Sequence, residues 1–338
     1  MILTMQVNKT SVILPFKDTL KELDKILNAL SKQTEKPNEV IIINASIFEI
    51  NKIVAKYINF FQIIEKTFYN YDNKINAYPG LNRNLGIKYS NYDLIYFIDT
   101  KTIPSITWIE NSKKLLIESK SDIVFGSTMY KSNSYFTDLI LDLSYGTILY
   151  ETVPGSIIYK KKFSSVGPFL NIIRAGEDLE WKKRVKNKIK YIKNNKEKLV
   201  YSNIKSNIFK IIKMYFIYAF HNSNIILIKN FKYRIQKISF LFFIIILSYF
   251  LINLITSLNF NSIIIYFLFV IILSYIFFRG FIYPLIVRKV KIKKLIYFRW
   301  VILGFIGLTL DISKYLGFIS GILINLIKQS LNISYNLK

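Results

Sequence analysis

The first 200 residues alternate between short apolar runs and helical stripes of apolar side chains. Residues 11–14 form an apolar run, which Pro15 is expected to end, and residues 40–43 form the next run. Between them, leucines recur at steps of three and four residues, as on one face of a helix. These leucines are Leu20, Leu23, Leu27 and Leu30. A strand, a helix and a strand at this spacing predict a right-handed βαβ unit.

The alternation continues to about residue 192 and predicts an α/β domain with a mixed, mostly parallel sheet. Further elements are expected as helices at 47–57, at 82–87 and after Trp108, strands at 60–64, 122–127 and 155–159, and a loop at 71–80. The run 94–98 predicts a buried strand that stops at Asp99. Ligands of open α/β sheets bind beyond the carboxyl ends of strands, so Asp99 is a candidate ligand-facing residue. A turn or helix-cap role is the ordinary alternative.

The last third of the chain has the pattern of a membrane region. Residues 238–258 and 263–282 each approach the roughly 20 apolar residues that cross a bilayer. Their link is short and uncharged, whereas the next loop, 288–299, is rich in Lys and Arg and is therefore expected in the cytoplasm. Because the N-terminus lacks a signal-peptide pattern, we expect a multi-pass protein of the cell membrane whose first domain is cytoplasmic.

A third apolar stretch, 300–327, contains Asp311 and Lys314 near its middle. Three residues apart on a helix, they share a face and can pair. The stretch is expected either to cross the membrane with these charges paired or to form an in-plane amphipathic or re-entrant helix. The second arrangement is favoured because charges are costly at the bilayer centre.

The charge and composition of the chain limit the classes of molecule that it is expected to bind. The chain has 47 Lys and Arg against 21 Asp and Glu, a net charge of +26, and no Cys, which excludes disulfides and thiolate sites. Within residues 203–234, basic residues mix with Ile, Phe, Met and Tyr, as in a helix lying among lipid head groups. Anionic membrane lipids are thus expected partners, and nucleic acid is not, since the charge accompanies apolar spans. His221, the only His, is expected to be interfacial rather than catalytic.

Two other sequence patterns contain candidate binding or catalytic residues. Arg83 is expected either to face an anionic ligand, because its guanidinium fork suits phosphate, or to lie solvated on the surface. Glu177 and Asp178 follow a Gly and open a predicted helix. They suit the end of a cleft, but first-turn acids that offset the helix dipole give the same pattern.

A series of short motifs runs through this domain in order. They are Pro15 after the first strand, Pro37 before the second, Arg83-Asn84-Leu85-Gly86-Ile87, Phe97-Ile98-Asp99-Thr100-Lys101-Thr102-Ile103-Pro104, Trp108, Gly167-Pro168-Phe169, and Gly176-Glu177-Asp178 with Arg184. In order and spacing, over residues 11–192, this series resembles the family 2 glycosyltransferases of GT-A fold. The resemblance implies a nucleotide-diphosphate sugar donor and an inverting, hexosyltransferase-type transfer to an acceptor hydroxyl.

The resemblance also implies roles for single residues. Asp99 matches the first Asp of the family's Asp-x-Asp motif, which holds Mg²⁺ or Mn²⁺ on the donor diphosphate. Asp178 matches the base that removes the acceptor proton, while Glu177 binds acceptor or positions that base. Four residues are expected around the donor besides Asp99, namely Pro15, Asn44, Arg83 and Lys101.

Two positions depart from the family pattern. Lys101 replaces the second Asp of the metal motif, and Asn44-Ala45 replaces the acids that usually end the second strand. A protonated Lys cannot bind a metal. Three interpretations stay open: Lys101 substitutes for the metal as a fixed cation, which is marginally favoured; Asp99 holds the metal with other groups; or the donor site is degenerate. Asn44 still donates and accepts, so base recognition is retained with altered preference.

Together these features predict a GT-A catalytic domain at 1–200, a basic interfacial segment at 201–236 and a helical membrane region at 237–338. The expected function is transfer of a sugar from a nucleotide-diphosphate sugar to a lipid-linked or cell-surface glycan acceptor, in polysaccharide biosynthesis of the cell envelope. Two alternatives remain: transfer onto a polyprenyl phosphate, and a catalytically silent nucleotide-sugar-binding or scaffold subunit, for which Lys101 is the discriminating feature.

Overall fold

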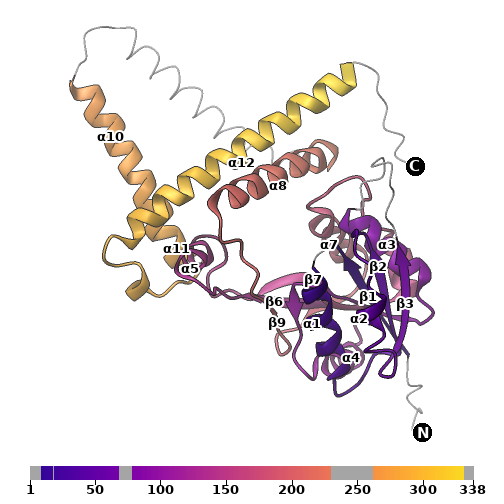
Figure 1. Cartoon of the computed structure of the whole chain (residues 1–338). Coiled ribbons are helices and arrows are strands. Elements are labelled where there is room, and N and C mark those ends of the chain that lie inside the picture. The colour runs from indigo at the N-terminus through magenta and orange to yellow at the C-terminus, as the bar shows by residue number, and fades with distance from the viewer. Residues whose placement is uncertain (1–8, 18, 68–77, 230–261, 331–338) are drawn as a thin grey trace. The chain divides into compact units, whose positions relative to one another are not determined.

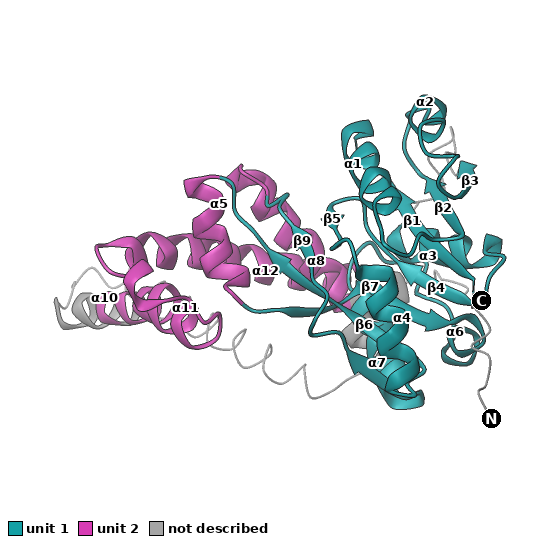
Figure 2. Ribbon diagram, turned by 90° about the horizontal axis from the view of Figure 1, so that it is seen from below, with its two compact units in different colours: residues 1–133, 148–204 teal, residues 134–147, 205–338 magenta. Residues whose placement is uncertain are grey.

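The computed structural model describes residues 9–17, 19–67, 78–229 and 262–330 (Figure 1). The chain divides into two compact units (Figure 2). Unit 1 comprises residues 1–133 and 148–204, and unit 2 comprises residues 134–147 and 205–338. The predicted helix 238–258 and most of the predicted loop 71–80 lie outside the described residues.

Unit 1 is built on one sheet of nine described strands. They are β1 (Thr10–Phe16), β2 (Glu39–Asn44), β3 (Gln62–Thr67), β4 (Leu94–Phe97), β5 (Thr102–Ile103), β6 (Ile123–Tyr130), β7 (Tyr150–Tyr159), β8 (Tyr191–Lys193) and β9 (Leu199–Tyr201). The order is β3-β2-β1-β4-β7-β6-β9-β5, with β8 paired to β6. β3, β2, β1 and β4 are parallel, whereas β7 is antiparallel to both β4 and β6. The mixed, mostly parallel sheet confirms the predicted GT-A type of α/β fold.

Helices cover both faces of this sheet, which explains why its central strands are apolar throughout. On one face, α1 (Leu20–Ser31) and α4 (Trp108–Glu118) pack on Val12, Leu14 and their neighbours. On the other face, Ile13 and Phe97 contact the apolar residues of three helices. These helices are α3 (Pro79–Tyr89), α6 (Lys160–Val166) and α7 (Glu177–Lys188). Neighbouring residues of one strand thus belong to different halves of the core.

The prediction that Pro15 ends the first strand is wrong. β1 continues to Phe16, and Pro15 is paired with Ile43 of β2. The last pair between β1 and β4 is Ile13 with Phe97, so Pro15 lies beyond the end of β4 pairing. Its missing N–H therefore interrupts no ladder on that side.

Unit 2 is helical in its described part. It contains α5 (Tyr135–Ile140), the π-helix η1 (Leu141–Tyr145), α8 (Ile208–Lys229), α10 (Ser262–Phe277), the π-helix η2 (Phe278–Ile282), α11 (Tyr283–Ile286), the 3₁₀ turn η3 (Ile292–Lys294) and α12 (Arg299–Ser330). α8 runs beside α12 (Figure 1). The two helices approach closely because Ser313 Oγ donates to the carbonyl of Ile212 at 2.8 Å, and because Gly317 lies against the backbone of Phe216.

Asp311 of α12 joins three charged or polar partners. Its carboxylate accepts from Arg279 Nε at 2.7 Å, from Tyr275 at 2.8 Å and from Lys314 Nζ at 2.8 Å. The predicted pairing of Asp311 with Lys314 is therefore confirmed. Because Arg279 lies in η2, the same carboxylate also fixes α12 to the neighbouring helix.

Among the described residues, one helical segment is long and apolar enough to cross a membrane, Arg299–Ile327. Ile272–Ile286, which overlaps the second predicted span, is a shorter apolar stretch. The described part of the chain therefore does not support the predicted multi-pass arrangement.

Candidate active site

The site lies where the order of the sheet reverses. From β1 the chain moves outward to β2 and β3, then returns to form β4 on the other side of β1. Crossovers that diverge from two neighbouring parallel strands leave a crevice beyond their carboxyl ends, where ligands of α/β proteins bind. Asp99 follows β4 by two residues, at this edge.

Arg83 brings three of the predicted site residues into one network. Its Nη1 donates to Glu177 Oε1 at 2.9 Å, and its Nη2 donates to Asp99 Oδ1 at 3.2 Å. The guanidinium also lies over the ring of Phe169, 5.6 Å from its centroid. Arg83 is only 4% exposed. The guanidinium is thus bound by two protein carboxylates, an arrangement that neither alternative for Arg83 had described.

The position of Arg83 follows from the way α3 packs. Gly86 lies so close to β1 that a Cβ at this position would be 2.3 Å from Ile13 Cγ2. Arg83 and Ile87, one turn apart, are both buried beside the sheet. Asn84 fixes the far side of the helix, because its amide donates to the Phe169 carbonyl and accepts from the Phe169 N–H, each at 2.9 Å. Asn84 belongs to the motif series, but its two hydrogen bonds to the backbone of Phe169 were not predicted.

Glu177 is buried, with 5% of the residue exposed. Burial raises its pKa to about 7; Arg83 opposes this rise and the neighbouring Asp178 adds to it. Burial lowers the pKa of Arg83, but Asp99, Glu177 and Asp178 together raise it above the ordinary value. Arg83 is therefore a permanent cation, whereas Glu177 can exchange a proton near neutral pH.

Asp178 has a different environment from Glu177. It is half-buried, and its Oδ1 accepts the backbone N–H of Leu179 at 2.8 Å. Both acids lie in the first turn of α7, whose N-cap is Gly176 with φ 90° and no side-chain cap, so their charges also offset the helix dipole. The two acids therefore both offset the helix dipole and act on the charge of Arg83.

From the sequence, no role was predicted for Lys182, which lies one helical turn after Asp178. Its Nζ donates to the carbonyl of Glu151 at 2.6 Å. Burial lowers the pKa of Lys182, while Asp178 and Glu151 raise it. The i, i+4 spacing of Asp178 and Lys182 was the available sequence signal.

The remaining predicted donor residues are not among the hydrogen-bond partners of Arg83 given above. Asn44 binds protein at both ends of its amide: Nδ2 donates to the Phe48 carbonyl and to Glu65, and Oδ1 accepts from Ser46. Pro15 lies inside β1. Lys101 is half-buried in the turn between β4 and β5, two residues after Asp99.

The residues fit a metal only in part. Within the described ranges, no three His, Cys, Asp or Glu side chains gather as a metal site. The side chain of Asp99 is 40% exposed, and only its Oδ1 is bonded to Arg83. Mg²⁺ commonly binds through one or two carboxylates together with substrate phosphates. Asp99 therefore fits as a single protein ligand, whereas Lys101 does not.

Comparison with known proteins identifies the domain. Residues 11–170 match the family model "Glycosyl transferase family 2". The chain therefore contains a glycosyl transferase family 2 domain. This match agrees with the family that the sequence resembles. The glycosyltransferase AglE of Haloferax volcanii is 25% identical over 190 residues, which cover 52% of this chain and 60% of AglE. The match thus spans about three fifths of that relative's length.

Two solved structures align with this chain at low similarity. Residues 1–349 of S. aureus TarS align with a TM-score of 0.45 and 17% identity, covering 62% of this chain and 65% of that one. A mannosyltransferase of Pyrobaculum calidifontis, PcManGT, solved with GDP-Man and Mn²⁺, aligns with a TM-score of 0.47 and 12% identity, covering 66% and 65%.

Proposed function

We propose that this protein is a glycosyltransferase that moves a sugar from a nucleotide-diphosphate sugar to a hydroxyl of a lipid-linked or cell-surface glycan acceptor, with inversion at the anomeric carbon. The family domain supports the donor class. The observation that carries the site assignment is the Arg83 network, in which Asp99 from the β4 end and Glu177 from the start of α7 share one buried cation.

The two acids of α7, Glu177 and Asp178, have different proposed roles. Glu177 is buried and bound to Arg83, so it positions the network. Asp178 is more accessible and keeps its Oδ2 for an acceptor. In the transfer, the acceptor oxygen attacks the anomeric carbon, the bond from that carbon to the diphosphate oxygen breaks, and the nucleoside diphosphate leaves with the bonding electrons. Asp178 takes the proton of the attacking hydroxyl.

Lys101 supplies positive charge that offsets the negative charge of the leaving diphosphate. A divalent cation held by Asp99 would add to this effect. Such a cation neutralises charge on the leaving group. Lys101 supplies a fixed charge at the same strand end, and a positioned Lys stabilises developing phosphate charge in the same sense. The departure from the family motif is then a change of cation rather than a loss of function.

The acceptor class rests on the helical unit. The exposed side of α12 is a stripe of large apolar side chains spaced by three to seven residues, as on one helix face. These are Ile302, Phe305, Ile312, Leu316 and Leu323. An apolar cavity of about 330 Å³ lies between α8 and α12 and includes Phe209, Phe216 and Leu316. Exposed apolar surface of this extent marks an interaction site, and a lipid bilayer fits both the stripe and the helix length.

Titration calorimetry of the full chain in detergent tests the donor site. UDP and GDP are titrated in Mn²⁺ and in EDTA into the wild type, Lys101→Ala and Lys114→Ala, whose exposed Lys pairs with Glu118 on α4. We expect binding that survives EDTA in the wild type and in Lys114→Ala but is lost in Lys101→Ala. Binding only with Mn²⁺ in all three would instead assign the charge to a metal on Asp99. The same proteins are then assayed for release of the nucleoside diphosphate with lipid-linked and soluble acceptors.

The silent-subunit alternative is favoured by one observation, the Lys at position 101, and the same experiment decides it. A protein that binds neither nucleotide under any condition, or binds one and turns over with no acceptor, would support it over an enzyme.

A further inference from the structure

The segment 287–298, between α11 and α12, exposes aromatic and aliphatic side chains instead of burying them. We call it the basic-aromatic loop. Tyr297 is 88% exposed and Phe298 is 80% exposed. Ile292 and Ile296 are also exposed. Single exposed apolar residues are normal on a soluble protein, but four within seven residues of one loop require an explanation.

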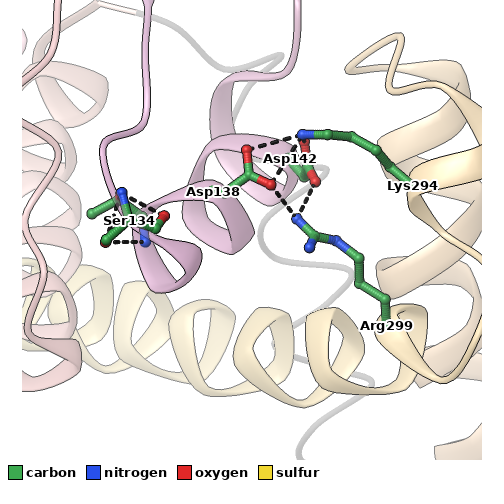
Figure 3. Close-up of polar contacts among 6 residues, drawn as sticks. Ser134, Asp138, Asp142, Lys294 and Arg299 are labelled. Carbon is green, nitrogen blue, oxygen red and sulfur yellow. Dashed lines mark hydrogen bonds and ion pairs between the residues drawn. The ribbon is translucent and has the colours of Figure 1, made fainter.

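The loop is held in place from within. Val290 and Leu295 are buried, with 2% and 0% of each residue exposed. Lys294 Nζ lies 2.9 Å from Asp138 and 3.3 Å from Asp142 (Figure 3). Arg299, the first residue of α12, binds the same two acids at 2.7 Å each. These contacts join the loop to the segment 134–147 of unit 2, so the exposed side chains belong to an anchored surface.

The backbone is strained where the aromatic side chains lie. Tyr297 has φ 57° and Phe298 has φ 55°, both in the left-handed region. Bulky L residues rarely adopt this conformation, and they keep it only where the surrounding structure imposes it. Two successive aromatic residues are thus held outward in a conformation that a flexible loop would relax.

The charge around these aromatic residues is positive and uncompensated. The sequence of unit 2 contains three acids, Asp138, Asp142 and Asp311. All three are engaged, the first two by Lys294 and Arg299 and the third by Arg279 and Lys314. Lys289, Lys291 and Lys293 of the loop are exposed, and no ion pair described for the chain includes them.

We propose that the basic-aromatic loop is a docking site for an anionic phospholipid bilayer. Tyr297 and Phe298 insert at the boundary between head groups and acyl chains, and Lys289, Lys291 and Lys293 contact lipid phosphates. Aromatic rings concentrate at this depth, and Lys near the surface is attracted to anionic lipids. A bilayer fits better than a second copy of the chain, because two loops of this charge would repel each other. The inference rests on the membrane association proposed above but not on glycosyl transfer.

The absence of Cys from the chain allows a direct test. Tyr297→Cys and, separately, Phe298→Cys are labelled with a nitroxide in the full chain, and the protein is placed in nanodiscs of phosphatidylcholine with or without phosphatidylglycerol. Collision with oxygen, which dissolves in lipid, is compared with collision with a water-soluble nickel chelate. The matched control is Ile58→Cys, an apolar residue of unit 1 that is 57% exposed.

We expect the labels at 297 and 298 to collide at least severalfold more with oxygen than with nickel, and the Ile58→Cys label to show the opposite. Replacing Lys289, Lys291 and Lys293 by Gln should remove the dependence on phosphatidylglycerol. Labels at 297 and 298 that behave like the control, in protein retained by the nanodiscs, would overturn the loop assignment alone. Labels shielded from both reagents would indicate a protein contact and also overturn it. Protein that does not stay with the nanodiscs would overturn the membrane association as well. Either label position suffices if the other variant does not fold.

Discussion

Replacing Arg83 by Met would remove the cation that Asp99 and Glu177 share. The two arms differ in burial: the Glu177 side chain is 6% exposed, and the Asp99 side chain is 40% exposed. Removing one partner of a buried ion pair costs about 3–5 kcal/mol, because the other charge stays buried and unpaired. An exposed pair contributes about 0–1 kcal/mol. We therefore expect unit 1 to lose about 3–5 kcal/mol of unfolding free energy at pH 8, almost all through Glu177.

The measurement uses the full chain in detergent. Hydrogen exchange followed by mass spectrometry gives the free energy of opening for peptides that cover α3 and α7. Lys56→Met is the control, because its pair with Asp24 at 3.1 Å joins side chains that are 58% and 40% exposed. This control should change stability by less than about 1 kcal/mol.

The double variant Arg83→Met/Glu177→Gln tests the cause of the loss. If the unpaired Glu177 carboxylate accounts for the cost, removing its charge should restore at least half of the lost stability. The loss should also shrink at pH 5, because the pKa of Glu177 is already raised by burial and the carboxyl can take up a proton. A single variant that costs less than about 1 kcal/mol, or a double variant no more stable than the single one, would refute the reasoning.

Four further results are expected. Asp178→Asn should lower kcat by about 10²–10⁴ with nearly unchanged donor KM, and a loss confined to Glu177→Gln would reverse the assignment of base. Lys101→Asp, which restores the family motif, should make nucleotide binding in calorimetry dependent on Mn²⁺. The pKa of Glu177 is raised from 4.5 to about 7, so between these pH values the folded chain holds a proton that the unfolded chain has released. The free energy of unfolding should therefore fall as the pH rises through this window. Urea titrations at several pH values should show this slope in the wild type and not in Glu177→Gln. Asp311→Asn should loosen the described helices of unit 2 in hydrogen exchange and leave the exchange of unit 1 unchanged, because Asp311 binds within unit 2 alone.

The elements that the sequence predicted well are those with a clear pattern of apolar residues along the chain. β1, α1 and β2 were found because both faces of the sheet are covered, which makes the strands apolar throughout, while α1 keeps one apolar stripe. The expected helix 47–57 is only α2 (Asn51–Val54). Its first half is a loop, because Asn44 donates to the carbonyl of Phe48 and its Oδ1 accepts from Ser46. An apolar period alone cannot show such side-chain bonds to the backbone.

Strand β7 shows a second kind of limit. The expected strand began at residue 155, after Pro154, whereas β7 begins at Tyr150 and passes through Gly155 with φ 87°. The pairing of β6 and β7 shifts register between Val124 and Gly126. A Cβ on Gly126 would lie 2.2 Å from the Pro154 carbonyl oxygen, so the close approach depends on glycine. A Pro-Gly pair commonly marks a turn, but here it marks an irregularity inside a continuous strand.

The site could be predicted as a set of residues but not as a set of contacts. Asp99, Glu177 and Asp178 follow recognisable local patterns at the ends of elements. Their link through Arg83 joins residues separated by 94 positions, and a local pattern carries no information about which carboxylate such an Arg will bind. The bonds of Asp138 and Asp142 to Arg299 span still longer separations, of 161 and 157 positions. Tertiary packing alone decides these pairs.

In the proposed donor site, Lys101 changes the charge that meets the diphosphate. In the proposed site, the carboxylates of Asp99, Glu177 and Asp178 are matched by three basic side chains, those of Arg83 and Lys182 and, by our assignment, that of Lys101. An Asp at position 101, as in the family motif, would lower the local charge by two units, which is the charge that one divalent cation returns. A diphosphate approaching the motif with two Asp residues therefore needs the metal to offset carboxylate repulsion, whereas beside Lys101 that repulsion is already reduced. Under the proposed function, the substitution moves the required positive charge from a bound ion to the chain, and we expect donor binding not to depend on the concentration of free metal.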